Sequence, residues 1–280
     1  MRIKTNNTIG IKLNIDTSKS ISKTQFDEIQ KLLFKYKVVV IKKQQLTDEE
    51  LLRFAHKFGT VFDANKAQVL GSKDGKTSEV VVVGNNAPEY EEAFLGHQEV
   101  LPHSDHQWVE EPSSISMLYA IDVSEGSAPT KWTDTTAVYN SLSDKLKIEI
   151  SNKRIVTFNP FYRPFGEVSA KYVNRIEDIP PGEQVSHPLV RTHPYTKEKI
   201  LYMHRAYEME FENEPFKSGV KLWNTLNDCI DNSKFVYEHY WEKGDLVIWD
   251  NRATLHYRKP FDSHIRRVLK RVSIAGEKPF

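Results

Sequence analysis

The chain has 280 residues, and its 39 lysines and arginines nearly balance its 38 aspartates and glutamates, which leaves a net charge of +1. This balance provides no global field that would attract nucleic acid or anionic lipid. No segment approaches the ~18 consecutive apolar residues of a membrane span, and the first residues lack the apolar core of a signal peptide. We therefore expect a cytoplasmic globular protein with no nucleic-acid or membrane partner, and the single cysteine, Cys229, agrees with a reducing compartment.

The first half of the chain is predicted to contain helices and strands in turn. Apolar residues at helical spacing between residues 26 and 33 predict a helix, and VVVI at 38–41 predicts a strand. Thr47 and Glu50 have the spacing of a capping box, so a second helix begins there and ends near Gly59. EVVVVGN at 79–85 and SISMLYAIDV at 114–123 predict two further strands.

The second half continues the same mixture. One or two helices are expected after Thr133, and residues 214–232 predict a long helix with apolar side chains along one side, at Val220, Trp223, Leu226 and Ile230. Strands are predicted at 199–205, 245–251 and 266–276. Strands with helices inserted between them, rather than regular βαβ alternation, favour a mainly β fold such as an antiparallel sandwich or jelly roll. Because no repeat or linker divides the chain, we expect residues 1–280 to form a single domain.

The stretch LPHSDHQW at 101–108 is a candidate metal site. In an extended segment residues i and i+2 project to the same face, so His103 and Asp105 can offer a nitrogen and an oxygen to one ion, whereas His106 points the other way. The best candidate for a third ligand is His256 in GDLVIWDNRATLHYR. Two histidines and one carboxylate form the facial triad that suits Fe(II) and leaves positions open. An H-x-D tripeptide alone is a weak signal, however, and a polar structural loop is the commoner explanation.

The basic segment FDSHIRRVLKRVSI near the C-terminus is a second candidate. Arg267 and Arg271 lie on the same face of the predicted strand, ~13 Å apart at ~3.3 Å per residue. A guanidinium matches a carboxylate through two parallel hydrogen bonds, so the two arginines could hold two separate anionic groups. The alternative is a solvated basic strand or a phosphate-contacting patch.

Together these motifs resemble the taurine dioxygenase family of Fe(II)- and 2-oxoglutarate-dependent oxygenases. The likeness is clearest from HSD to TKWTDTTAVYNSLS, in SHPLVRTHPYTKEKILYM, and from WDNRATLHY to RRVLKRVSIAGEKPF. It implies a double-stranded β-helix, the cupin-like form of the jelly roll. It also implies functional roles for particular side chains: the iron ligands are His103, Asp105 and His256, and the residues that bind the distal carboxylate of 2-oxoglutarate are Thr130 and Arg267.

The resemblance implies that Fe(II), 2-oxoglutarate and O2 take part in the reaction, which gives succinate and CO2 and oxidises a small molecule. Hydroxylation is the expected outcome. Asp105 argues against halogenation, because halogenating relatives lack this carboxylate. Desaturation or oxidative decarboxylation of an amino-acid derivative in a natural-product pathway stays open.

The substrate is predicted from a few side chains. Arg271 matches the arginine that meets the acidic group of taurine in the taurine enzyme, which indicates an anionic substrate. Glu99 stands where that enzyme has asparagine and suits a cationic or hydroxyl-bearing group, while Tyr207 replaces a phenylalanine and Phe161 or Phe165 could form aromatic walls. We therefore expect an amino acid or a related amphoteric acid, with taurine-type sulfonate oxygenation as the alternative.

Three other interpretations are open at this point. A non-catalytic metal-binding jelly roll would leave Thr130 and Arg267 without a role. A zinc hydrolase is disfavoured because the sequence has no H-E-x-x-H or similar signature. A nucleic-acid-binding protein is disfavoured because the sequence has neither a large net charge nor a nucleic-acid-binding motif. The resemblance allows for a homodimer or homotetramer. We also predict a lid over roughly residues 64–98 that orders on substrate binding, because this segment is polar and precedes the first predicted ligand.

Overall fold

The computed structural model describes residues 8–63, 79–85, 94–163 and 171–280. Its helices are α1 (Lys23–Tyr36), α2 (Asp48–Ala55), α3 (Thr135–Ser141), α4 (Asp144–Ile150) and α5 (Phe216–Asp231). Its strands are β1 (Ile11–Leu13), β2 (Val38–Ile41), β3 (Val81–Asn85), β4 (Phe94–Leu95), β5 (Val100–His103), β6 (Ile115–Val123), β7 (Thr130–Asp134), β8 (Arg154–Phe158), β9 (Gln184–Pro188), β10 (Val190–Thr192), β11 (Lys199–Leu201), β12 (Met209–Phe211), β13 (Val236–His239), β14 (Leu246–Asp250), β15 (Thr254–Arg258) and β16 (Arg267–Ile274).

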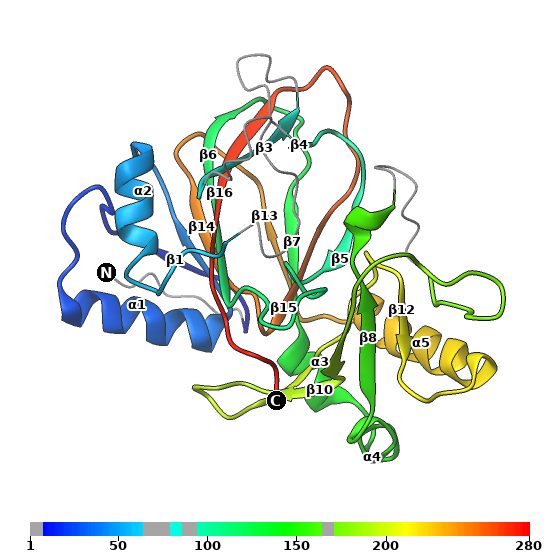
Figure 1. The fold of residues 1–280 in the computed structure, drawn as a ribbon. Helices are drawn as coiled ribbons and strands as arrows, with labels where there is room; N and C mark the ends of the chain where they lie inside the picture. The colour runs from blue at the N-terminus through cyan, green and yellow to red at the C-terminus, as the bar shows by residue number, and fades with distance from the viewer. Residues whose placement is uncertain (1–7, 64–78, 86–93, 164–170) are drawn as a thin grey trace.

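Two sheets packed against each other form the centre of the fold (Figure 1). The larger has the order β1-β2-β14-β6-β16-β3-β4, and the smaller has the order β13-β7-β15-β5. Strands far apart in the sequence pair antiparallel, such as β14 with β6 and β16 with β6. Between the sheets lie apolar side chains from both, including Trp132 of β7 and Trp249 of β14, whose ring centroids are 5.7 Å apart. The predicted antiparallel sandwich is thus present.

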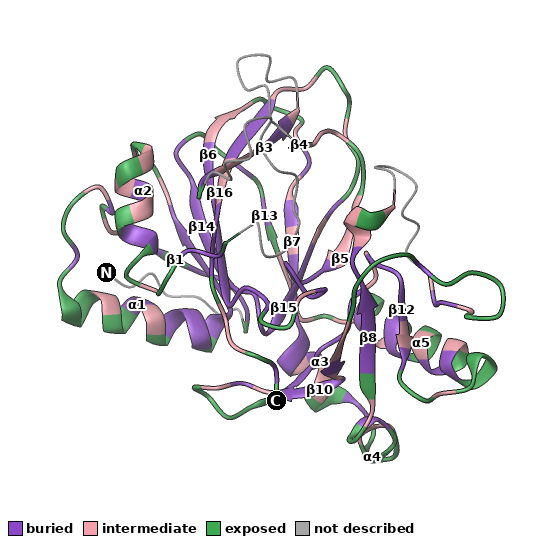
Figure 2. Ribbon diagram, in the orientation of Figure 1, coloured by how far each residue is buried: buried purple, intermediate pink, exposed green. Residues whose placement is uncertain are grey.

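Alternation along the strands of the larger sheet separates two cores. On β6, Met117 and Tyr119 pack with the helices α1 and α2, whereas Leu118 and Ala120 face the smaller sheet. Figure 2 shows these central strands largely buried, while α1 and α2 turn exposed residues outward. Both helices begin at complete capping boxes, and the one predicted at Thr47 is confirmed. Helix α2 ends at Ala55 rather than near Gly59, because residues 56–58 form a turn.

A second layer packs beside the smaller sheet, on the right of Figure 1. It consists of the three-stranded sheet β12-β8-β9, the β10-β11 hairpin and helices α3, α4 and α5. Its core joins Val138 of α3 and Leu255 of β15 to the apolar side of α5, where Leu226 and Ile230 are buried as predicted. This layer anchors β15, which reaches the candidate site, from the side opposite the larger sheet. Among the described residues, no helix is long and apolar enough to cross a membrane.

Candidate active site

Three side chains that could hold a metal ion converge between the two sheets. His103 ends β5, and the strand register places it directly opposite His256 of β15. The Nε2 atoms of His103 and His256 lie 3.6 and 3.7 Å from Oδ1 of Asp105, and the two imidazole centroids are 4.0 Å apart. Within the described part of the chain, this is the group of His, Cys, Asp and Glu side chains whose ligand atoms lie close enough to share one ion.

The chain around Asp105 is a turn and not the extended segment that the sequence suggested. β5 ends at His103, and His106 adopts a left-handed backbone with φ of 62°. The turn is held by buried Asn251, whose Oδ1 accepts from the Asp105 amide at 2.9 Å and whose Nδ2 donates to the Asp105 carbonyl at 3.0 Å. The same Nδ2 donates to the Ser113 carbonyl at 2.8 Å. Asn251 therefore positions the carboxylate. The available signal in the sequence was the Asp250-Asn251 pair, which is typical of a turn and follows a predicted strand.

Hydrogen bonds orient the candidate ligands. Nδ1 of His103 lies 2.8 Å from the carbonyl oxygen of Leu101, so this nitrogen carries the proton and Nε2 keeps a lone pair for a metal. Ser116 on β6 donates to Oδ2 of Asp105 at 2.8 Å, which leaves Oδ1 directed at the two imidazoles. Hydrogen bonds of this kind, from groups that do not touch the metal themselves, fix the orientation of the ligands in metal sites.

The electrostatics of the cluster also suit a cation. Burial raises the pKa of Asp105, but the guanidinium of Arg271 beside it outweighs burial and holds that pKa well below its usual value. Burial, helped by His103, lowers the pKa of His256 to about 3. The cluster thus presents an ionised carboxylate and a neutral imidazole at neutral pH, the protonation states that metal binding requires.

A second buried group lies next to these ligands. Arg267 of β16 is 3% exposed, and its Nη2 donates to Oγ1 of Thr130 on β7 at 3.2 Å. Trp241 donates to the same oxygen at 2.9 Å and lies under the guanidinium, 5.8 Å from ring centroid to Cζ. The Thr130 oxygen accepts twice, so its own proton is available to a third partner. Nε of Arg267 has no hydrogen-bond partner among the described residues.

Arg258, which was not predicted from the sequence, lines the same cavity as Arg267 and Thr130. Its Nη2 donates to the carbonyls of Leu95 at 3.2 Å and Gly96 at 3.0 Å. Burial and, to a smaller extent, Arg258 lower the pKa of Arg267 to about 9. The position of Arg258 two residues beyond His256 on one strand was the available signal.

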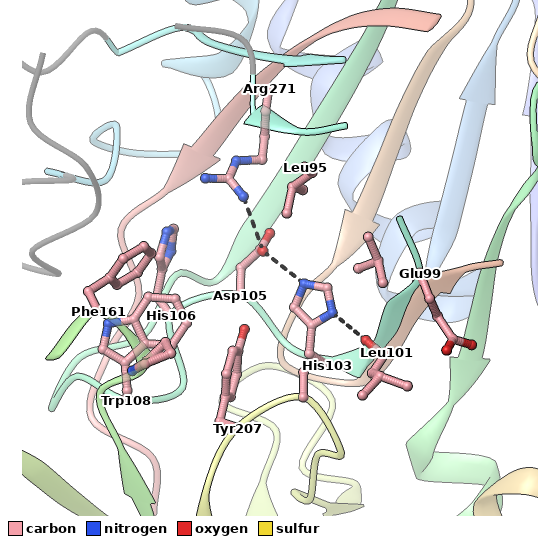
Figure 3. Close-up of a pocket in the computed structure, with 13 residues that line it drawn as sticks. Leu95, Glu99, Leu101, His103, Asp105, His106, Trp108, Phe161, Tyr207 and Arg271 are labelled. Atoms are coloured by element: carbon pink, nitrogen blue, oxygen red, sulfur yellow. Dashed lines mark hydrogen bonds and ion pairs between the residues drawn. The ribbon is translucent and has the colours of Figure 1, made fainter. Parts of the chain in front are cut away.

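A cavity of about 250 Å³ opens on the other side of the candidate ligands and contains Arg271. Arg271 reaches Oδ1 of Asp105 with Nη1 at 3.4 Å (Figure 3). Three aromatic rings form one wall: Trp108 packs edge-on against Tyr207 at 4.9 Å and against Phe161 at 5.5 Å. The cavity also shares His103 and Arg271 with the one that holds Arg267, so the two adjoin at the candidate ligands.

The other residues predicted to bind substrate differ in whether the structure places them in this cavity. Tyr207 lines the cavity with its hydroxyl directed toward Asp105 in Figure 3. Glu99 also lines it, but this side chain is exposed and its carboxylate points away from Asp105 and Arg271. Phe165 and most of the predicted lid, residues 64–78 and 86–93, lie outside the described residues.

Comparison with known proteins extends over nearly the whole chain. Residues 3–273 match the model of the family described as taurine catabolism dioxygenase TauD, TfdA family. The alpha-ketoglutarate-dependent 2,4-dichlorophenoxyacetate dioxygenase of Cupriavidus pinatubonensis (strain JMP 134 / LMG 1197) is 29% identical over 268 residues, which cover 93% of this chain and 92% of that protein.

Two solved structures are similar in fold. AAD-2 in complex with Mn(II) and N-oxalylglycine has a TM-score of 0.75 and 26% identity, with coverage of 100% of this chain and 97% of that one. A taurine dioxygenase from Burkholderia xenovorans has a TM-score of 0.76 and 25% identity, with coverage of 97% and 89%. These likenesses confirm the predicted jelly-roll fold.

Proposed function

Because this chain belongs to the taurine catabolism dioxygenase TauD, TfdA family, whose members matched here are 2-oxoglutarate-dependent dioxygenases, we propose that His103, Asp105 and His256 hold the Fe(II) of such an enzyme. The chain is a non-haem iron dioxygenase that uses 2-oxoglutarate and O2. The observation that supports this set of ligands most directly is their convergence beside Arg267, a buried cation with no carboxylate partner among the described residues.

The three side chains fit an iron ion. Distances of 3.6 and 3.7 Å from Asp105 to the two imidazoles are below twice the ~2.0–2.2 Å that imidazole and carboxylate ligands keep from a first-row ion such as zinc. One ion can therefore touch Asp105 and either histidine at once. Two imidazoles and one carboxylate on one side leave the other coordination positions open, as an oxygenase requires.

The cavity around Arg267 and Thr130 fits the distal carboxylate of 2-oxoglutarate. The guanidinium offers two parallel donors, one of them the unpaired Nε, and Thr130 offers a hydroxyl proton. These donors adjoin the candidate iron ligands through a shared cavity wall that includes His103 and His256. N-oxalylglycine, which occupies AAD-2 with Mn(II), carries two carboxylates like 2-oxoglutarate.

When bound, Fe(II) and 2-oxoglutarate supply the activation of O2 that yields succinate, CO2 and an oxidised substrate. The side chains of this protein bind and orient the reactants. Ser116 and Asn251 hold Asp105, while Leu101 fixes the His103 tautomer. The walls of the two cavities, formed largely by apolar side chains, limit water around the reacting centre.

The substrate that we propose is a small anion with an apolar body. Arg271 lines the 250 Å³ cavity beside Asp105 and would place an anionic group near the candidate iron site. Trp108, Phe161 and Tyr207 provide a flat apolar wall for the rest of the molecule. An amino acid belongs to this class, but the outward direction of Glu99 gives its ammonium group little support (Figure 3). Hydroxylation is the proposed outcome, and the whole chain is proposed to act as one domain.

The test is an anaerobic absorbance titration of the full chain, first with Fe(II) and then with 2-oxoglutarate. We expect a visible charge-transfer band that needs both additions and that is absent from His256→Ala. Carboxylates, sulfonates and amino acids are then screened for a shift of that band and for succinate formation in air. Iron binding without the band would contradict the proposed role of the cavity around Arg267 and Thr130.

A further inference from the structure

His106 in the stretch LPHSDHQW was predicted to point away from the candidate ligands, but the structure does not place it so. It lines the same cavity as Arg271 and Tyr207 and is 2% exposed (Figure 3). The opposite direction was expected because residues 103–106 were predicted to be extended. The turn at Asp105 and the left-handed backbone of His106 rotate the imidazole onto the cavity wall.

The imidazole is held rigidly by its neighbours. It stacks on Phe62 with centroids 3.9 Å apart and an interplanar angle of 5°, and Trp108 meets it edge-on at 5.6 Å. Phe62 and Trp108 belong to one buried aromatic cluster with Tyr207. A ring fixed on one face by stacking loses little conformational entropy when a ligand meets its edge.

One polar atom of this imidazole, Nδ1, is not used by the described part of the protein. Nδ1 of His106 is buried and has no hydrogen-bond partner among the described residues. A buried polar atom without a partner costs about 1–3 kcal/mol, so native structures retain one chiefly where a ligand or a water completes it. Most other residues of this cavity wall are apolar. Its remaining polar side chains include two of the candidate iron ligands, His103 and Asp105, together with Tyr207, Arg271 and the outward-directed Glu99.

We propose that His106 is a substrate-binding residue that forms a hydrogen bond with a neutral polar group of the substrate. The substrate then has three parts: an anion at Arg271, a planar or otherwise compact apolar body on the wall of Trp108 and Phe161, and a hydroxyl or amide group at His106. This inference rests on the proposed function, because it assumes that the 250 Å³ cavity is the substrate site.

The experiment uses matched probes on the intact chain. Phenylacetate and its 2-, 3- and 4-hydroxy isomers are titrated anaerobically into protein loaded with Fe(II) and 2-oxoglutarate, and dissociation constants are measured by calorimetry. In the wild-type protein we expect at least one hydroxy isomer to bind about fivefold to tenfold more tightly than phenylacetate, the gain of one hydrogen bond.

Two variants of His106 separate hydrogen bonding from packing. His106→Phe keeps the stack on Phe62 and removes the polar edge, so it should lose the preference for the hydroxy isomer while its affinity for phenylacetate changes less than twofold. His106→Asn keeps hydrogen-bonding groups and tolerates a left-handed backbone, so it should retain part of the preference. The matched control is His187→Phe, because His187 is also buried with an unpaired Nδ1 but does not line the cavity.

The outcomes distinguish the two proposals. If the charge-transfer band forms but no hydroxy isomer binds better than phenylacetate, or if the preference persists in His106→Phe, the role of His106 is wrong and the oxygenase assignment stands. If the preference disappears equally in His187→Phe, the effect is structural and the inference is likewise overturned. If the band itself does not form, the proposed function of the site is at fault.

Discussion

Replacement of Arg267 by methionine should weaken 2-oxoglutarate binding and stabilise the protein without ligands. The guanidinium keeps its charge at neutral pH, because its lowered pKa is still about 9. Two charge-assisted hydrogen bonds to a carboxylate are worth about 1.5–3 kcal/mol each. Their loss, about 3–5 kcal/mol allowing for a compensating water, corresponds to a 10²- to 10⁴-fold weaker affinity.

The opposite effect is expected on stability. In the absence of 2-oxoglutarate the buried Arg267 charge faces Arg258 and has no carboxylate partner among the described residues. Methionine fills similar space on Trp241 without a charge, so the free energy of unfolding should rise by about 1–2 kcal/mol. Urea unfolding of the metal-free protein measures this change.

The assay for binding is the anaerobic titration of 2-oxoglutarate into Fe(II)-loaded protein, and Arg267→Lys is the intermediate case. Lysine keeps a charge but cannot form two parallel hydrogen bonds, so it should lose about tenfold to a hundredfold. An affinity of Arg267→Met within threefold of wild type, with iron binding unchanged, would refute the assignment of this cavity to the distal carboxylate.

Three further changes test the supporting structure. Asn251→Leu removes the hydrogen-bond partner of the buried Asp105 amide and the buried Ser113 carbonyl. The free energy of unfolding, measured with urea, should therefore fall by about 3–5 kcal/mol. An unchanged unfolding midpoint would contradict the role of Asn251 in holding the turn. Ser116→Ala removes the donor to Oδ2 of Asp105 and should weaken Fe(II) binding about tenfold or more in a competition with a chelator, with stability changed by less than half as much as in Asn251→Leu. Burial lowers the pKa of His187 to about 4, below its unfolded value near 6.5, so the unfolded chain takes up a proton first as the pH falls and stability is lost between pH 6.5 and 4. From pH 7 to pH 5 this histidine alone accounts for about 2 kcal/mol, and His187→Gln should lose that much less; equal losses in both proteins would argue against it.

Local patterns in the sequence determined several helices and strands, and also the face of a strand on which two candidate site residues lie. Two-residue alternation along 266–274 put Arg267 and Arg271 on one face, and the structure turns both toward the cavities between the sheets. The capping box at Thr47 and the apolar side of residues 214–232 predicted helices that are present. These features depend on neighbours within a few residues, so the sequence contains all that is needed to predict them.

The tertiary structure alone decided which residues meet. His103 and His256 are opposite each other because of the register between β5 and β15, and Asn251 reaches Asp105 across 146 residues of sequence. The direction of His106 depends on one left-handed residue in a turn that is stabilised by those distant hydrogen bonds. The family resemblance predicted which three side chains hold iron. The charge of Arg258 beside Arg267 and the place of His106 on the cavity wall follow instead from packing between strands whose pairing the sequence does not show.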